Sequence, residues 1–151
     1  AGYGHTRMKL VVGFGNTMRN DDGVGWQVAN HLALLYPASD VEVMTVHQLL
    51  PEIAAYAAEA DQVIFVDASI DGEPGTVRVC EVVPLDQLED AHALTPAGIL
   101  NLCRTLYDAH PVTYLVTITG ASFDLGETLS DEVQAAIPGA VAAIQQLLED
   151  G

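Results

Sequence analysis

The segment from Met8 to Gly25 constrains the fold most, because it joins a buried strand to a helix through a glycine turn. Its first part, Leu10 to Val12, is a continuous apolar run that ends at Gly13, which is typical of a strand buried on both faces. Glycines then allow a sharp turn, after which Asp21 or Asp22 is expected to cap a helix. In open α/β sheets, ligands bind at the edge formed by the carboxyl ends of the strands, so we expect the functional site at this turn.

The rest of the chain alternates strand and helix patterns. Apolar periodicity predicts strands over 41–46, 63–66, 76–83 and 112–119, and helices over 22–35, 51–57, 96–106 and 130–148. Pro138 is expected to kink or divide the last helix. The link before 76–83 is too short for a helical crossover, so this strand should lie antiparallel at an edge. The order predicts one domain over 8–151, a three-layer α/β/α sandwich with a mostly parallel sheet of about five strands.

Charge and composition limit the partners and the compartment. The 151 residues include 5 Lys+Arg and 21 Asp+Glu, a formal charge of −16, which disfavours nucleic acid and anionic membranes. We find no apolar run long enough to span a membrane. Cys80 and Cys103 match no metal or redox spacing, so we expect both to be buried and the protein to be cytoplasmic. Residues 1–7 are expected to be a cloning remnant or a disordered N-terminus.

Three common catalytic or cofactor patterns are absent or incomplete. The segment from Gly13 to Met18 resembles a dinucleotide fingerprint, but the third glycine is missing and no acidic residue ends the second strand. The chain has no Gly-Lys-Ser/Thr triphosphate loop. Ser122 is not in a nucleophile-elbow pattern, so serine hydrolase chemistry is disfavoured.

A set of acidic and imidazole side chains falls where predicted elements begin or end. Asp21 and Asp22 precede the first helix, Asp67 follows the 63–66 strand, and His92 precedes the 96–106 helix. Such ligands suit a divalent transition metal that polarises a carbonyl or activates water. The spacing also leaves plain structural roles open: a helix cap for one of the paired aspartates, a turn cap for Asp67, and an ordinary loop position for His92.

Three segments in order resemble the signature segments of the hydrogenase maturation proteases. These are Gly-Phe-Gly-Asn-Thr-Met-Arg-Asn-Asp-Asp-Gly-Val-Gly at 13–25, Val-Ile-Phe-Val-Asp-Ala at 63–68, and His-Ala-Leu-Thr-Pro-Ala-Gly-Ile-Leu at 92–100. Members of that family trim the C-terminus of the large subunit of nickel-iron hydrogenases and have an α/β/α fold. The resemblance therefore implies the same fold and an endopeptidase acting on the large-subunit precursor.

The resemblance also implies a metal set and a source for the metal. Carried over by motif, the catalytic and nickel-contacting residues are Asp22, Asp67 and His92, with Asp22 chosen because it directly precedes Gly23-Val-Gly25. The nickel is expected to be supplied by the precursor, so that cleavage follows nickel insertion, and no resident organic cofactor is expected.

The residues around this set are expected to form the groove for the precursor tail. We predict a groove lined by Gly13, Gly15, Asn16, His47 and Gly120, with a structural role as the alternative for His47. Two other functions use the same features: a noncatalytic nickel-sensing chaperone of the precursor tail, and a small-ligand-binding α/β domain. Cleavage of the tail distinguishes the protease from the chaperone, and nucleotide binding would identify the small-ligand-binding domain.

Overall fold

A computed structural model describes residues 8–84 and 94–150. Five strands form one sheet in the order β2-β1-β3-β5-β4. In chain order they are β1 (Lys9–Phe14), β2 (Val41–Val46), β3 (Gln62–Ser69), β4 (Val77–Glu81) and β5 (Val112–Thr119). β1, β2, β3 and β5 run parallel, and β4 pairs antiparallel with β5 at the edge, as the short link before it predicts.

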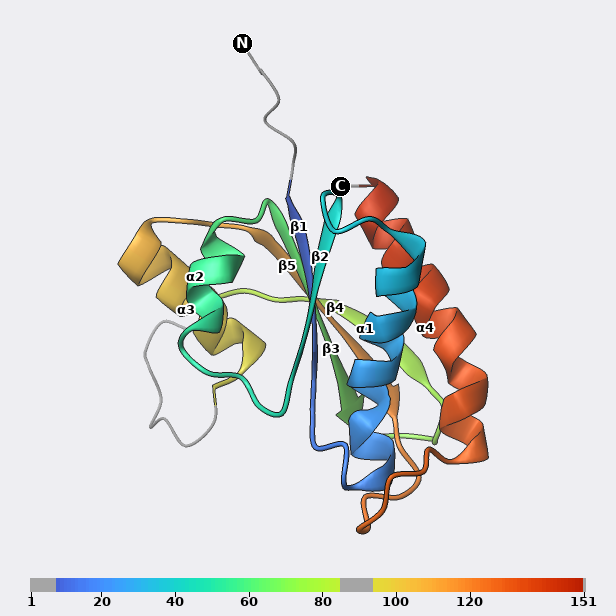
Figure 1. The fold of residues 1–151 in the computed structure, drawn as a ribbon. Coiled ribbons are helices and arrows are strands. Elements are labelled where there is room, and N and C mark those ends of the chain that lie inside the picture. The colour runs from blue at the N-terminus through green and yellow to red at the C-terminus, as the bar shows by residue number, and fades with distance from the viewer. Residues whose placement is uncertain (1–7, 85–93, 151) are drawn as a thin grey trace.

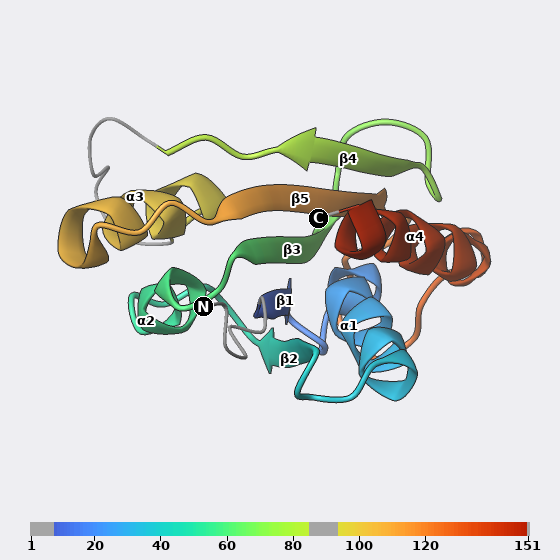
Figure 2. The same cartoon turned by 90° about the horizontal axis from the view of Figure 1, so that it is seen from above.

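Helices cover both faces of the sheet (Figures 1 and 2). They are the 3-10 helix η1 (Asn20–Gly23), α1 (Val24–Leu35), α2 (Ile53–Ala58), α3 (Pro96–Tyr107) and α4 (Asp131–Asp150). α1 and α4 lie on one face, and α2 and α3 lie on the other (Figure 2). This is the predicted three-layer sandwich with a mostly parallel sheet.

Each face of the sheet has its own apolar core. The core between the sheet and the helices α1 and α4 includes Val28, Ile64 and Ile144. The core between the sheet and the helices α2 and α3 includes Leu10, Phe65 and Ile99. The central strands are buried on both faces, and each large apolar side chain that they remove from water stabilises the fold by about 1.5–3 kcal/mol. No helix in the described ranges is long and apolar enough to cross a membrane.

Most element ends follow the sequence patterns. The hydroxyl of Thr95 accepts a bond from the Gly98 N–H at 3.1 Å and caps α3, which Pro96 begins. Ser130 similarly caps α4 by accepting from the Val133 N–H at 3.3 Å. Pro138 does not divide α4, which continues from Asp131 to Asp150 through it.

Other local predictions were wrong because tertiary contacts decide them. Cys80 is exposed, since it lies on the edge strand β4, whereas Cys103 is buried as predicted. The short strand predicted to end at Val66 continues to Ser69, because β5 offers backbone partners as far as Thr119. Asp67 therefore lies within β3 and not after it.

Candidate active site

The turn after β1 is built to present Asp22 at the carboxyl edge of the sheet. Gly15 has a φ of 145°, and a Cβ added there would lie 2.1 Å from the Asp22 carbonyl oxygen, so only glycine fits. The next residue, Asn16, donates its backbone N–H to Asp22 Oδ2 at 2.7 Å. The same loop therefore reverses the chain and orients the Asp22 carboxylate, which is half-buried.

Trp26, which the sequence did not single out, fixes this turn to the neighbouring strand. Its indole Nε1–H lies 3.1 Å from the carbonyl oxygen of Gly15 and 3.0 Å from that of Val46. The Gly15 N–H also donates to Val46 at 3.1 Å. The ends of β1 and β2 are thereby joined through one side chain. Its only sequence signal is that it is the single tryptophan of the chain.

The prediction that Asp21 or Asp22 caps the first helix was wrong. α1 begins at Val24 with Gly23 as its N-cap, and no side chain makes a capping hydrogen bond there. The two aspartates lie instead in η1, one short helix earlier. A 3-10 turn inserted between the glycine loop and α1 moves both carboxylates away from the cap position.

Asp21 is fully buried and holds the loop that follows β5. Its carboxylate accepts backbone N–H bonds from Ala121 at 2.7 Å, Ser122 at 3.0 Å and Ser130 at 2.7 Å. Burial acts to raise the pKa of Asp21, but these donors together outweigh it, so the pKa is lowered and the side chain stays ionised. Every hydrogen bond that the structure shows for the Asp21 carboxylate is accepted from a backbone N–H of the same chain.

Asp67 is the counterpart of Asp22 on β3. Its Oδ1 accepts the N–H of the next residue, Ala68, at 2.8 Å. Burial raises the pKa of Asp67 to about 7, the Ala68 bond opposes the shift, and the negative charge of Asp22 adds to it. At neutral pH this carboxyl group exchanges its proton readily.

The fold brings Asp22 and Asp67 together because α1 starts almost in contact with β3. A Cβ added at Gly25 would lie 2.4 Å from the Val66 carbonyl oxygen, so the absence of a side chain permits this approach. The third predicted ligand, His92, lies outside the described residues. Within 8–84 and 94–150, no group of three or more His, Cys, Asp or Glu side chains could hold a metal ion.

The predicted groove residues lie around this edge in different environments. Gly13 is buried against α1, where an added Cβ would lie 2.2 Å from the Gly25 carbonyl oxygen. Gly15 is buried, Asn16 and Gly120 are half-buried, and His47 is exposed directly after β2. Close packing explains Gly13 and Gly15 without a ligand, and the part of these residues in a groove stays a prediction.

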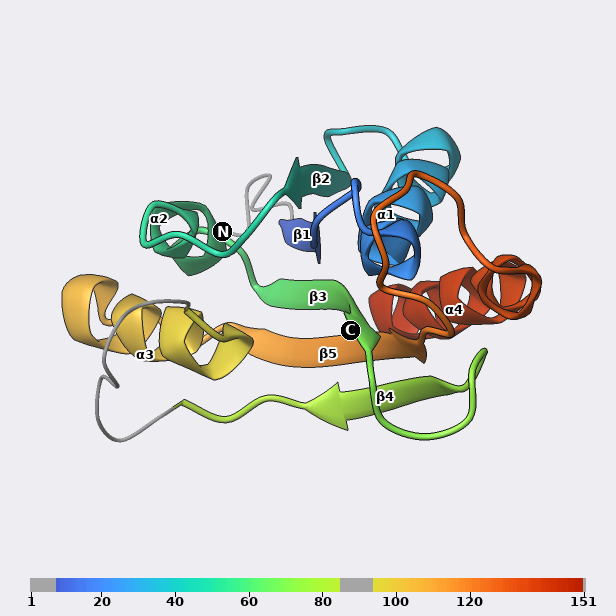
Figure 3. The ribbon, with the colours of Figure 1, turned by 90° about the horizontal axis from the view of Figure 1, so that it is seen from below.

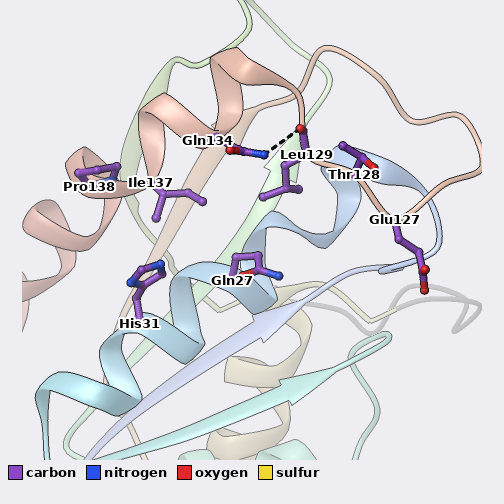
Figure 4. Close-up of a pocket in the computed structure, with 8 residues that line it drawn as sticks. All are labelled: Gln27, His31, Glu127, Thr128, Leu129, Gln134, Ile137 and Pro138. Carbon is purple, nitrogen blue, oxygen red and sulfur yellow. Dashed lines mark hydrogen bonds between the residues drawn. The ribbon is translucent and has the colours of Figure 1, made fainter.

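A separate pocket of about 540 Å³ lies between α1 and α4 (Figure 4). Gln27 and His31 from α1 face Ile137 and Pro138 from α4 across it. Gln134 at its rim donates to the Leu129 carbonyl at 3.3 Å. Neither Asp22 nor Asp67 lines this pocket, so it is distinct from the carboxylate pair.

Comparison with known proteins decides the family. The model of the family described as hydrogenase maturation protease matches residues 27–147. The chain belongs to the hydrogenase maturation protease family. A Methanocaldococcus jannaschii protein, MJ0253, named as a possible member of this family, is 29% identical over 145 residues, which cover 89% of this chain and 92% of that protein.

Solved structures of hydrogenase maturation proteases have the same fold over almost the whole chain. The maturating endopeptidase HybD of Escherichia coli is 25% identical with a TM-score of 0.80, and the match covers 95% of this chain and 93% of that one. The nickel-iron hydrogenase maturation protease HycI of Thermococcus kodakarensis is 26% identical with a TM-score of 0.72, covering 97% and 95%. The α/β fold predicted from the sequence is therefore that of the family.

Proposed function

We propose that this protein is an endopeptidase that removes the C-terminal extension of a nickel-iron hydrogenase large-subunit precursor after nickel insertion. The juxtaposition of Asp22 and Asp67 carries this proposal. The two carboxylates come from separate elements and lie at the carboxyl edge of the sheet, and the charge of Asp22 adds to the larger effect of burial in raising the pKa of Asp67. Membership of the protease family supplies the reaction class.

The structure separates the two adjacent aspartates by the bonds that they make. Asp21 is committed to three backbone N–H groups, whereas the described bond to the Asp22 carboxylate is from Asn16 alone. Asp22 therefore keeps lone pairs for an external ligand, which supports its choice over Asp21. A cation beside Asp22 and Asp67 favours the ionised form of both carboxyl groups, so nickel in the precursor is a suitable counter-charge.

Nickel belongs to the substrate in this proposal. We assign Asp22, Asp67 and His92 as its contacts from the protease, leaving coordination positions for precursor ligands or water. No resident organic cofactor is required. Hydrolysis then adds one water across the scissile amide, either at a carbonyl polarised by the metal or with Asp67, whose pKa is about 7, taking the proton from water. We place the reaction in the cytoplasm.

The test is cleavage of a defined precursor. The purified protein is mixed with nickel-loaded and nickel-free precursor, and the mass of the large subunit is followed. We expect loss of the C-terminal extension from the nickel-loaded form alone. Asp22→Asn, Asp67→Asn and His92→Ala should each abolish it, while Asp40→Asn, at an exposed turn on the opposite edge of the sheet, should cleave normally.

Three outcomes would each overturn a part of the proposal. Normal cleavage by both Asp22→Asn and His92→Ala would remove the site assignment. An unchanged precursor mass with a stable complex between the two proteins would favour the noncatalytic chaperone. Equal cleavage of the nickel-free precursor would show that nickel is not required.

A further inference from the structure

Two loops at the active-site edge are joined so firmly that they act as one surface. The first, residues 16–20, leaves β1, and the second, residues 121–128, leaves β5 (Figure 3). An isolated parallel bridge pairs Arg19 with Gly126. The Asn20 N–H donates to the Gly126 carbonyl, and the Gly126 N–H donates to the Met18 carbonyl, both at 2.8 Å.

Side chains strengthen this connection. Asn20, at a φ of 44°, accepts the Thr128 N–H at 3.1 Å and donates to the Ser122 hydroxyl at 3.2 Å. The buried Asp21 carboxylate accepts two further bonds from the second loop, from Ala121 and Ser122, and one from Ser130 just beyond it. A left-handed asparagine and a buried charge are both costly to maintain, and here they serve to keep the two loops in register.

The joined loops carry an exposed apolar pair. Met18 and Leu125 are the residues directly before the two bridge residues, so the parallel register of the bridge places their backbones side by side. Their exposed fractions are 54% and 76%. Scattered exposed apolar residues are common, but these two are neighbours on a rigid support. We call Met18 and Leu125 the apolar patch.

The apolar patch is continuous with the carboxylate site through two hydrogen bonds. Met18 donates its N–H to Asn16 Oδ1 at 2.9 Å, and the Asn16 N–H donates to Asp22 Oδ2 at 2.7 Å. A peptide whose scissile bond lies at Asp22 therefore has this surface within its reach. Exposed Asp124 and Glu127 flank Leu125, and exposed Arg19 follows Met18, so two negative charges against one positive charge disfavour an acidic segment.

We propose that the apolar patch binds an apolar, non-acidic segment of the precursor tail next to the scissile bond. This inference rests on the proposed function and adds a specificity-determining surface to it. The hydrogen bonds that join the loops form without the substrate, so binding does not have to create them. Met18 and Leu125 then set which tails are accepted, while the carboxylates perform the chemistry.

The test uses Leu125→Ser, Met18→Ser and the double variant. Leu34→Ser is the matched control, because Leu34 is 85% exposed on α1 and is remote from the site. The KM for nickel-loaded precursor should rise roughly 5- to 20-fold in each single variant, in proportion to the apolar area that the tail covers, with kcat within about twofold of wild type. Leu34→Ser should leave both values unchanged.

Binding of the precursor, measured by fluorescence anisotropy, separates the failure modes. If the wild type cleaves the precursor and the double variant has an unchanged KM, the proposed role of the apolar patch is overturned and the proposed function is kept. Binding without cleavage would overturn the protease assignment. In that case the patch proposal would hold if the double variant weakened binding of the precursor about 10-fold or more, and would be overturned by a smaller effect. A wild-type protein that neither cleaves nor binds the precursor would overturn both. All three side chains are exposed, so the variants should fold normally.

Discussion

Replacing Asp67 by Asn should stabilise the protein while destroying its proposed activity. The Asp67 carboxyl has a pKa of about 7 against a usual 3.8, because burial and the Asp22 charge both oppose its ionisation. Asn has the same shape, and its carbonyl oxygen can keep the bond from the Ala68 N–H. The substitution therefore removes an unfavourable charge without creating a cavity.

The size and sign follow from the two pKa values. Between pH 3.8 and about 7 the folded state holds the Asp67 proton more tightly than the unfolded state does, so this group lowers stability as pH rises through that range. The full difference of about 3 pKa units corresponds to about 4 kcal/mol above pH 7. Solvent screening at a half-buried position makes this figure a ceiling.

Urea unfolding at pH 5 and pH 8 measures the effect. The free energy of unfolding of Asp67→Asn, relative to wild type, should increase by up to about 2–3 kcal/mol between the two pH values. Asp40→Asn, which removes a carboxylate from an exposed turn, should show little such change. A difference between Asp67→Asn and wild type that is independent of pH would refute the reasoning, as would destabilisation of the variant at pH 8.

Three further substitutions, one of them paired with a control, test the elements that build the site. Asp21→Asn cannot accept all three backbone N–H bonds, so we expect a loss of about 1–3 kcal/mol in urea unfolding and faster amide hydrogen exchange in the loop after β5. Gly25→Ala places a Cβ against the Val66 carbonyl oxygen and should destabilise by several kcal/mol, whereas Gly139→Ala, in α4 with open space around it, should raise stability by about 0.5–1 kcal/mol; equal melting temperatures for the two would contradict the packing argument. Trp26→Phe removes the indole donor that joins β1 to β2 and should cost about 1 kcal/mol in thermal unfolding and lower the cleavage rate, and an unchanged rate would show that the turn keeps its position without it.

The sequence predicted the fold because its strongest signals are local. Apolar runs such as 63–66 specify strands buried on both faces, and the short link before β4 allows only an antiparallel neighbour. Thr95 and Ser130 cap helices through bonds to residues three positions away, which spacing can reveal. The extension of β3 to Ser69 was missed because its backbone partners lie about 50 residues later, in β5.

The two aspartates of η1 show where local reasoning stops. Both have the composition of helix caps, and neither caps α1. Asp21 accepts hydrogen bonds from Ala121, Ser122 and Ser130, which are about 100 residues away in the chain, and no local pattern predicts those partners. The choice of Asp22 as the ligand came from the family resemblance, and it remains a prediction for which the structure supplies a suitable geometry.

By itself the sequence determined the order of elements, the layered architecture and the candidate carboxylates, because periodicity, turn residues and motif spacing act over a few neighbouring positions. Only the tertiary structure decided which carboxylate is buried, how close Asp22 lies to Asp67, and that the loops after β1 and β5 form one surface. These properties depend on desolvation and on hydrogen bonds between segments about 100 residues apart, and such contacts exist only once the sheet has assembled.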